Sequence, residues 1–182
     1  MTNTNQAPGL IIYFSRAGEN YFAGEIRPIE KGNTERLVER LAALLKLPTH
    51  RVETLEVYPE NYQRCTEVAQ SEREDGIFRE VKTPLTQADV AEKEFLVFVG
   101  PCWWGRYPMA LIGAIKDLDL TGKRLYVVNT QEGSGVQETV QEVKALFPTA
   151  TFAGSLSVLG SDVENPALDK RLYSWAAALK LI

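Results

Sequence analysis

The sequence predicts a doubly wound α/β domain, in which helices cover both faces of a mostly parallel sheet. Three short apolar runs, at residues 10–14, 95–100 and 124–129, are rich in β-branched and aromatic side chains. Such runs are typical of parallel strands that are buried on both faces. Helical patterns separate them, and each right-handed crossover would return the chain to the same edge of the sheet. The predicted class is therefore a three-layer α/β fold.

Two further runs extend the predicted sheet to five strands. Residues 50–58, "HRVETLEVY", are more polar than the central runs and suit a strand at the edge of the sheet. Residues 151–160, "TFAGSLSVLG", are the fifth candidate. Residues 58–87 break the alternation of strands and helices, and their charged composition predicts a surface helix followed by a loop.

Two helices have clear boundaries in the sequence. The first begins at Asn33 and Thr34 and ends before Pro48. The last begins with Asn165 as its cap and Pro166 in its first turn. The apolar stripe of the first helix consists of Leu37, Val38, Leu41, Ala42, Leu44 and Leu45.

Two more helices are expected between the later strands. One starts near Pro108 and places Leu111 and Ile112 on its apolar side. The other follows Ser134, which together with Gln137 has the spacing of a capping box. With these helices, every predicted crossover has a covering element.

Length and charge narrow the class of protein. The chain has 182 residues, and we expect a single domain at residues 9–182 behind a flexible tail at residues 1–8. Its net charge is −4 and its basic residues are scattered, so no positive stripe indicates a nucleic-acid partner. No segment approaches the roughly 18 apolar residues of a membrane-spanning helix, and the N-terminus lacks a signal-peptide pattern. We expect a cytoplasmic protein without a membrane partner.

The cysteines and the histidine exclude several chemistries. Cys65 and Cys102 lie far apart and form no C-x-x-C pair, so neither a disulfide framework nor a thiolate metal site is indicated. His50 is the only histidine, and a surface role suits it better than a catalytic triad. Only three residues separate Cys102 from Arg106, which does not fit a phosphatase C-x₅-R loop. No catalytic residue and no metal ligand is therefore assigned.

Three loops follow the central strands, at the sheet edge where doubly wound folds bind ligands. The first loop runs from Ser15 to Asn33 and Thr34, where the free N–H groups and dipole of a helix start would hold a phosphate. Neither a Walker motif nor a G-x-G-x-x-G motif occurs, so one phosphate fits better than two. Taken alone, Asn33 could also be a simple helix cap.

The second loop contains two adjacent tryptophans, Trp103 and Trp104, within "PCWWGRYP". Pro101, Gly105 and Pro108 constrain the loop on both sides. The rings could belong to the core or to an interface patch. Beside a phosphate site, however, they favour a flat ring system with a phosphorylated tail as the ligand.

The third loop, "TQEGSGVQ", brings glycines to the same edge of the sheet. Gly133 and Gly135 would let the backbone approach a ligand closely, and the N–H groups of a helix start follow behind them. A heterocycle with carbonyl and imide edges could be recognised there by backbone groups alone. The alternative is a tight strand-to-helix turn with a good cap.

Together the three loops resemble the flavodoxin-like family, in the subgroup whose phosphate loop has an insertion. The resemblance covers nearly the whole chain, and rests on "YFSRAGENYFAGEI" leading to "GNTERL", then on "GPCWWGRYPM" and "TGKRLYVVNTQEGSG". It implies a five-stranded parallel sheet with the order 2-1-3-4-5, flanked by helices, and FMN as the cofactor.

The resemblance also implies roles for particular residues. Ser15, Asn33 and Thr34 would hold the phosphate, residues 101–105 would flank the isoalloxazine, and residues 130–135 would approach its pyrimidine side. The implied cofactor-binding residues are Ser15, Arg16, Ala17, Asn33, Thr34, Pro101, Cys102, Trp103, Trp104, Gly105, Thr130, Gln131, Glu132, Gly133 and Gly135.

The sequence departs from the usual S-x-T-G-N-T phosphate loop of that family. Ala17 replaces the second hydroxyl, and residues 19–32 are inserted before Asn33. A compensating phosphate contact from Arg16 or Tyr21 is therefore a hypothesis. A second hypothesis concerns Arg106, whose charge would make the reduction potential less negative than that of a strongly acidic flavodoxin.

Two functions are compatible with this resemblance. One is an FMN-binding carrier that passes electrons from a reductase to an acceptor. The other is an NAD(P)H-dependent FMN reductase of the quinone or azo type acting on small molecules, in which a dimer interface often completes the pocket. The partner would accordingly be a redox protein or a small-molecule acceptor.

Overall fold

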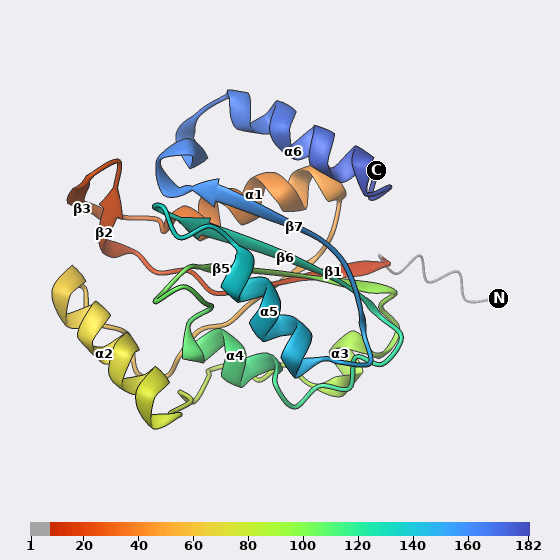
Figure 1. The fold of residues 1–182 in the computed structure, drawn as a ribbon, viewed down its shortest axis with the longest axis horizontal. Helices are drawn as coiled ribbons and strands as arrows, with labels where there is room; N and C mark the ends of the chain where they lie inside the picture. The colour runs from red at the N-terminus through yellow and green to blue at the C-terminus, as the bar shows by residue number, and fades with distance from the viewer. Residues whose placement is uncertain (1–7) are drawn as a thin grey trace.

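A computed structural model describes residues 8–182 and places five parallel strands in one sheet, ordered β4-β1-β5-β6-β7 (Figure 1). Counted along the chain, these sheet strands have the predicted order 2-1-3-4-5. The strands are β1 (Gly9–Tyr13), β4 (Thr49–Arg51), β5 (Phe95–Pro101), β6 (Arg124–Gln131) and β7 (Thr151–Leu159). The tail predicted at residues 1–8 lies, apart from Pro8, outside the described residues.

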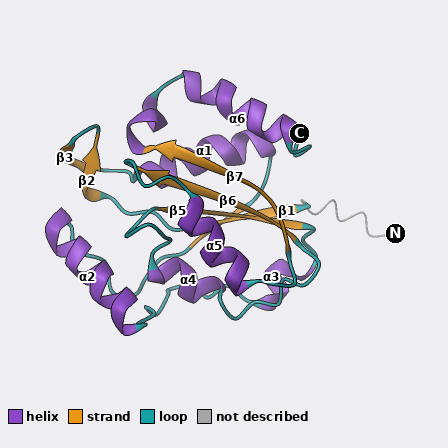
Figure 2. Ribbon diagram, viewed as in Figure 1, coloured by secondary structure: helices purple, strands orange, loops and turns teal. Residues whose placement is uncertain are grey.

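Helices cover both faces of the sheet, as Figure 2 shows. Helices α1 (Asn33–Leu45) and α6 (Ala167–Ala178) lie on one face. Helices α4 (Met109–Ile115) and α5 (Gln137–Leu146) lie on the other. The predicted three-layer α/β class is confirmed.

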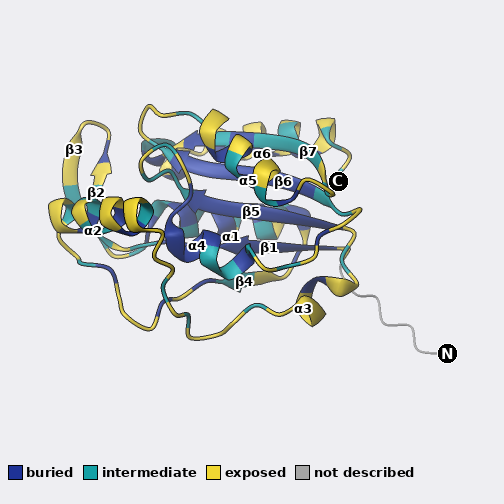
Figure 3. Ribbon diagram, turned by 60° about the horizontal axis from the view of Figure 1, so that its bottom comes forward, coloured by how far each residue is buried: buried dark blue, intermediate teal, exposed yellow. Residues whose placement is uncertain are grey.

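Two apolar clusters hold these layers together. Successive side chains of a strand point to opposite faces of the sheet. Ile12 and Phe98 accordingly pack in the cluster under α4 and α5. Their neighbours Ile11 and Val97 pack in the cluster under α1 and α6. Strands β1, β5 and β6 are buried along their length, which explains their continuous apolar sequences (Figure 3).

The edge strand predicted at residues 50–58 is much shorter in the structure. Strand β4 ends at Arg51 because its partner β1 ends at Tyr13, where the first loop leaves the sheet. Beyond it, Leu55 and Val57 alternate with polar residues but are exposed to solvent. Next to the strand, the N–H of Val52 donates to the carbonyl oxygen of Tyr13 at 2.7 Å, and Thr54 then forms an isolated antiparallel bridge with Val81.

The far edge of the sheet is blocked by side chains of α6. Arg171 donates a hydrogen bond to the carbonyl oxygen of Ser157 at 2.6 Å. The indole N–H of Trp175 donates to the carbonyl oxygen of Ser155 at 2.9 Å. Two carbonyl groups of the outer strand β7 therefore have partners from their own chain.

The capping box predicted from Ser134 and Gln137 is wrong. Helix α5 begins at Gln137 behind Val136, with no side-chain hydrogen bond at its cap. The preceding glycines, Gly133 and Gly135, have positive φ angles of 136° and 70° and direct the loop away from a capping geometry.

An antiparallel hairpin interrupts the first loop, where the sequence analysis expected only an insertion. Its strands are β2 (Gly18–Phe22) and β3 (Glu25–Ile29). Ala23 and Gly24 form its tip, with φ angles of 52° and 93°. Positive φ at both central residues is typical of the tight turns that join two antiparallel strands.

The surface helix predicted within residues 58–87 is confirmed as α2 (Tyr62–Asp75). It lies beside the β2–β3 hairpin at one end of the sheet (Figure 1). A short helix that was not predicted, α3 (Gln87–Ala91), and a 3₁₀ turn, η1 (Gly160–Glu164), complete the fold. No helix within residues 8–182 has both the length and the apolar character required to cross a membrane.

Candidate functional site

The loops that follow β1, β5 and β6 meet around a cavity of about 720 Å³. This volume falls within the range of small-molecule binding sites. The predicted residues that line it are Ser15, Arg16, Asn33, Thr34, Pro101, Cys102, Trp103, Trp104, Gly105, Thr130, Gln131 and Glu132. Three other predicted residues, Ala17, Gly133 and Gly135, are not part of the lining.

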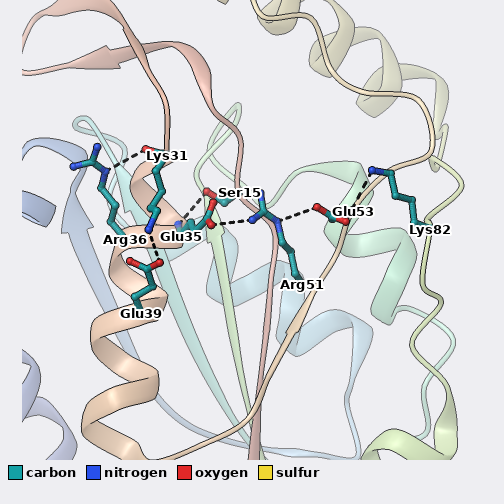
Figure 4. Close-up of polar contacts among 8 residues, drawn as sticks. All are labelled: Ser15, Lys31, Glu35, Arg36, Glu39, Arg51, Glu53 and Lys82. Atoms are coloured by element: carbon teal, nitrogen blue, oxygen red, sulfur yellow. Dashed lines mark hydrogen bonds and ion pairs between the residues drawn. The ribbon is translucent and has the colours of Figure 1, made fainter.

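The start of α1 is capped by a side chain of the first loop and not by a side chain of the cap residue. The cap residue is Gly32, and the Ser15 hydroxyl accepts a hydrogen bond from the N–H of Glu35 at 3.0 Å (Figure 4). A Cβ on Gly32 would lie 2.2 Å from Ser15 Oγ and 2.5 Å from the carbonyl oxygen of Arg16. Glycine is therefore required at this position, and Asn33 is the first residue of the helix rather than its cap.

Asn33 and Thr34 present different groups at the cavity. The Thr34 hydroxyl is 2.7 Å from the hydroxyl of Thr130, so this contact joins the first loop to the third. The side-chain oxygen of Asn33 is buried and has no hydrogen-bond donor among residues 8–182. A buried acceptor without a partner is costly, which makes this oxygen a candidate ligand contact.

A chain of ion pairs extends outward from the same helix start. Glu35 pairs with Arg51 at 2.9 Å, and Arg51 pairs in turn with Glu53 at 3.5 Å (Figure 4). On the outer side of the helix, Lys31 pairs with Glu39 at 2.6 Å. The first-turn carboxylate of Glu35 is thus compensated by a cation of β4.

Arg16 is engaged in holding loops together. Its guanidinium donates to the carbonyl oxygens of Glu19 at 2.6 Å, Pro59 at 3.0 and 2.5 Å, and Glu60 at 2.5 Å. These bonds use four of the five N–H donors of the guanidinium, so a phosphate contact from Arg16 stays a prediction. Tyr21, the other residue of that hypothesis, lines the cavity with its ring 6.3 Å from that of Tyr62.

The two tryptophans differ in their surroundings. The ring of Trp103 packs edge-to-face against Tyr58 at 5.0 Å and Phe14 at 5.5 Å, while still lining the cavity. Trp104 is 54% exposed, and its indole N–H donates to the carbonyl oxygen of Thr66 on α2 at 3.1 Å. Trp103 is therefore anchored in the core, whereas Trp104 lies at the mouth of the cavity.

A tight turn presents Trp104. The N–H of Trp103 donates to the carbonyl oxygen of Arg106 at 2.8 Å, and the reciprocal bond measures 3.2 Å. The central residues Trp104 and Gly105 have φ angles of 53° and 81°. The left-handed conformation costs a non-glycine residue about 1–2 kcal/mol. Backbone strain of this kind is often found at binding sites.

Tyr107 fixes this turn to the sheet. Its fully buried hydroxyl donates toward the carbonyl oxygens of Phe98 at 2.7 Å and Val128 at 2.8 Å, and accepts from the N–H of Val128 at 3.2 Å. Burial raises the pKa of this phenol well above its ordinary value. A Cβ on Gly100 would lie 2.7 Å from the tyrosine ring, so the ring fits only beside glycine.

The third loop is shaped by two amide side chains. The side-chain oxygen of Gln131 accepts hydrogen bonds from the N–H groups of Gly133 and Gly135. Asn129 donates to the carbonyl oxygen of Gly135 at 2.7 Å from inside the core. These bonds hold the two glycines within the loop, and neither glycine lines the cavity.

Glu132 lies where the third loop faces the hairpin. Burial raises the pKa of its carboxyl group, and backbone N–H groups of Ala23, Ser161 and Gly160 counteract that rise. Arg106, in contrast, is half exposed and outside the cavity lining, and pairs with Glu138 at 3.8 Å. Arg106, whose charge was expected to make the reduction potential less negative, thus has an acidic neighbour.

The sequence analysis assigned no site residue to one wall of the cavity. Helix α2 lines it with Tyr62, Cys65, Thr66 and Ala69, four positions on one face of the helix. In an otherwise charged segment, this stripe of small and aromatic residues at helical spacing is the signal that could have identified the wall. Further lining residues outside the predicted set are Asn20, Tyr21, Gln63, Glu67, Gln70, Ser134 and Gly160.

The cysteines of the cavity are ordinary thiols. Burial raises the pKa of both Cys65 and Cys102, so neither is a stabilised thiolate. Within residues 8–182, no group of three or more histidine, cysteine or acidic residues could hold a metal ion.

Comparisons with known proteins identify the fold. No family model and no curated protein matches the chain. A flavoprotein from Lactobacillus acidophilus in complex with FMN is similar, with a TM-score of 0.61 and 15% identity over 93% of this chain and 99% of that one. Oxidised flavodoxin 2 from Bacillus cereus gives a TM-score of 0.57 and 13% identity over 96% and 98% of the two chains.

A third similar structure is an enzyme. The apo form of an NADH:FMN oxidoreductase gives a TM-score of 0.58 and 11% identity, over 95% of this chain and 88% of that one. At these identities the likeness shows the fold, and this chain has the flavodoxin-like fold.

Replacing Tyr107 with Phe tests how firmly the tryptophan turn is anchored. The change removes the buried hydroxyl that bonds backbone groups of Phe98 and Val128, so the free energy of unfolding should fall by about 0.5–1.5 kcal/mol for each hydrogen bond lost. Urea titration measures it. Tyr173→Phe, on an exposed position of α6, is the control. Equal stability of Tyr107→Phe and the unmodified protein would contradict this role.

Proposed function

We propose that this protein binds FMN in the cavity and functions in electron transfer. The observation that carries the proposal is the meeting of three features in one cavity: a helix start, a strained tryptophan turn, and the third loop with Thr130, Gln131 and Glu132. FMN, when bound, supplies the redox chemistry, while the protein positions it and sets its potential.

The start of α1 suits the phosphate. Its first N–H groups have no partners within the helix, and the helix dipole favours a negative charge there. Gly32 keeps this end free of a side chain, and the Ser15 hydroxyl remains able to donate a hydrogen bond. The unpartnered oxygen of Asn33 is an acceptor and therefore suits a ribityl hydroxyl better than a phosphate oxygen.

The loops that follow β5 and β6 suit the ring system. Trp103 and Trp104 contribute flat apolar surfaces on the second loop, and Thr130 and Gln131 border the ring from the third loop. The neighbours of similar fold, a flavoprotein with FMN, a flavodoxin and an NADH:FMN oxidoreductase, support this assignment.

As its physiological role, we propose that the protein carries electrons between a reductase and an acceptor. A reductase acting directly on small molecules is the second candidate, and the wall formed by α2 favours it. This wall is fixed at its start by Glu19, whose carboxylate accepts from the N–H of Tyr62 at 2.9 Å, and along its length by Trp104. A fixed wall opposite the tryptophan turn would enclose a small substrate.

The experiment that tests FMN binding is purification of the protein followed by absorbance spectroscopy and chromatographic identification of the flavin. A colourless protein that does not bind added FMN would refute the proposal.

Rapid mixing of the FMN-loaded protein with NADPH then separates the two candidates. For a carrier we expect the flavin absorbance to persist until a separate reductase is added, whereas direct bleaching would identify a reductase.

Replacing Gly32 with Ala should weaken FMN binding at least tenfold, which corresponds to about 1.4 kcal/mol. The new Cβ would collide with Ser15 and displace the loop at the helix start. Fluorescence titration with FMN measures the dissociation constant.

The matched control is Gly122→Ala. Gly122 has a positive φ of 75°, unlike Gly32, and a Cβ there has open space and no contact with the cavity. This variant should lose stability while keeping its affinity for FMN. Equal affinities of the Gly32→Ala variant and the unmodified protein would exclude the proposed phosphate site.

The ion pair between Arg106 and Glu138 gives a test of the reduction potential. Glu138 lies against Gly105, so Arg106→Ala leaves a carboxylate uncompensated near the ring site and should lower the potential, an effect of about 1 kcal/mol. Glu138→Gln should raise it. Redox titration against reference dyes measures both variants, and shifts of the same sign in the two would contradict the electrostatic explanation.

A further inference from the structure

Two fully buried polar side chains contact the loops that follow β5 and β6. Asn129 lies in β6 and Thr139 in the first turn of α5, and neither is exposed to solvent. The Thr139 hydroxyl donates a hydrogen bond to the carbonyl oxygen of Gly105 at 3.2 Å. The tryptophan turn (residues 103–106) is therefore bonded to a helix that follows the third loop.

The side-chain amide of Asn129 holds the third loop beside this contact. Its nitrogen donates to the carbonyl oxygen of Gly135 at 2.7 Å and lies 3.5 Å from the Thr139 hydroxyl. An amide nitrogen has two hydrogen atoms to donate, and a hydroxyl can accept one bond while it donates another. One chain of hydrogen bonds thus runs from the third loop through Asn129 and Thr139 to the tryptophan turn.

A second contact joins the start of α5 to the turn, at the surface. A Cβ on Gly105 would lie 2.6 Å from the Glu138 carboxylate, and Glu138 pairs with Arg106 at 3.8 Å. Water screens an exposed ion pair of this kind, so it stabilises the turn only weakly. The Thr139 hydroxyl, in contrast, is buried, and its bond is the stronger attachment of the turn to α5.

Both of the connected loops border the site proposed for the flavin ring. Gly105 lines the cavity, and so do Thr130 and Gln131 of the third loop. Asn129 and Thr139 are not part of the lining. Thr139 therefore acts on a ligand only through the loops that it joins.

We propose that Thr139 is a positioning residue whose hydroxyl fixes the tryptophan turn to the start of α5, so that the second and third loops bind the ring as one unit. Two loops held in a fixed arrangement lose less conformational freedom when a ligand binds to both. The effect on FMN rests on the proposed function, whereas the attachment of the turn does not.

Hydrogen exchange of the full-length protein without added ligand tests the attachment. Thr139→Val keeps the shape of the side chain but removes the hydroxyl, so the Trp103 and Arg106 amides that close the turn should exchange at least twofold faster. Thr139→Ser keeps the hydroxyl and should stay within twofold of the unmodified protein. The control is Thr149→Val, which removes a hydroxyl bonded to Thr121 away from the cavity lining and should leave both rates unchanged.

Three results would overturn the attachment. The first is an increase of less than twofold in Thr139→Val. The second is an equal increase in Thr139→Ser or in Thr149→Val, because a change that spares the bond to the turn would then have the same effect. The third is an increase spread evenly over the whole chain, which would indicate general destabilisation.

A double-mutant cycle on the dissociation constant of FMN tests whether the two loops bind as one unit. The Gln131 side chain shapes the third loop through its bonds to Gly133 and Gly135, so Gln131→Ala should weaken binding. In the Thr139→Val background this loss should be at least threefold smaller than in the unmodified protein, because the unit is already divided. Gly32→Ala acts at the start of α1, and its loss should agree within twofold in the two backgrounds.

Two outcomes of the cycle would refute the joint action of the loops: a difference of less than threefold for Gln131→Ala, or a departure of equal size for Gly32→Ala. If the unmodified protein binds no FMN while the exchange results hold, the failure counts against the proposed function alone, since exchange is measured without ligand.

Discussion

The direction in which the chain leaves the central strands is the constraint on which the site depends. After β1 the chain passes to α1 on one face of the sheet, and after β5 it passes to α4 on the opposite face. The two connections diverge at neighbouring strands and leave an open position at the carboxyl ends, the general location of ligand sites in doubly wound folds. The cavity and all three loops occupy this position.

The elements added to this basic fold give the cavity its walls. The hairpin within the first loop reaches α2 through Glu19 and η1 through the ion pair of Arg27 with Glu164. Helix α2 is in turn held by Trp104, so the wall, the hairpin and the tryptophan turn support one another. The strained backbone of Trp104 is maintained by bonds on both sides of the turn and by the anchor at Tyr107.

Local patterns of the sequence were sufficient to predict the buried strands, the helix starts and the meeting of the three loops, whereas the sheet order came from the resemblance to the flavodoxin-like family. They were insufficient where the partner is distant in the chain. The cap of α1 comes from Ser15 rather than from Gly32, and Arg16 donates hydrogen bonds to carbonyl groups of residues 59 and 60. The hairpin, in contrast, has a local signal. Ala23 and Gly24 stand between two alternating runs, a pattern that indicates two antiparallel strands joined by a tight turn.

The covering of β7 by α6 has a consequence for the behaviour of the protein at high concentration. An open strand edge can recruit the same strand of another molecule and begin fibrous aggregation. Here Arg171 and Trp175 already occupy carbonyl groups along that edge, and the opposite edge is a strand of only three residues. Both borders of the sheet thus offer a shortened template for intermolecular β-structure.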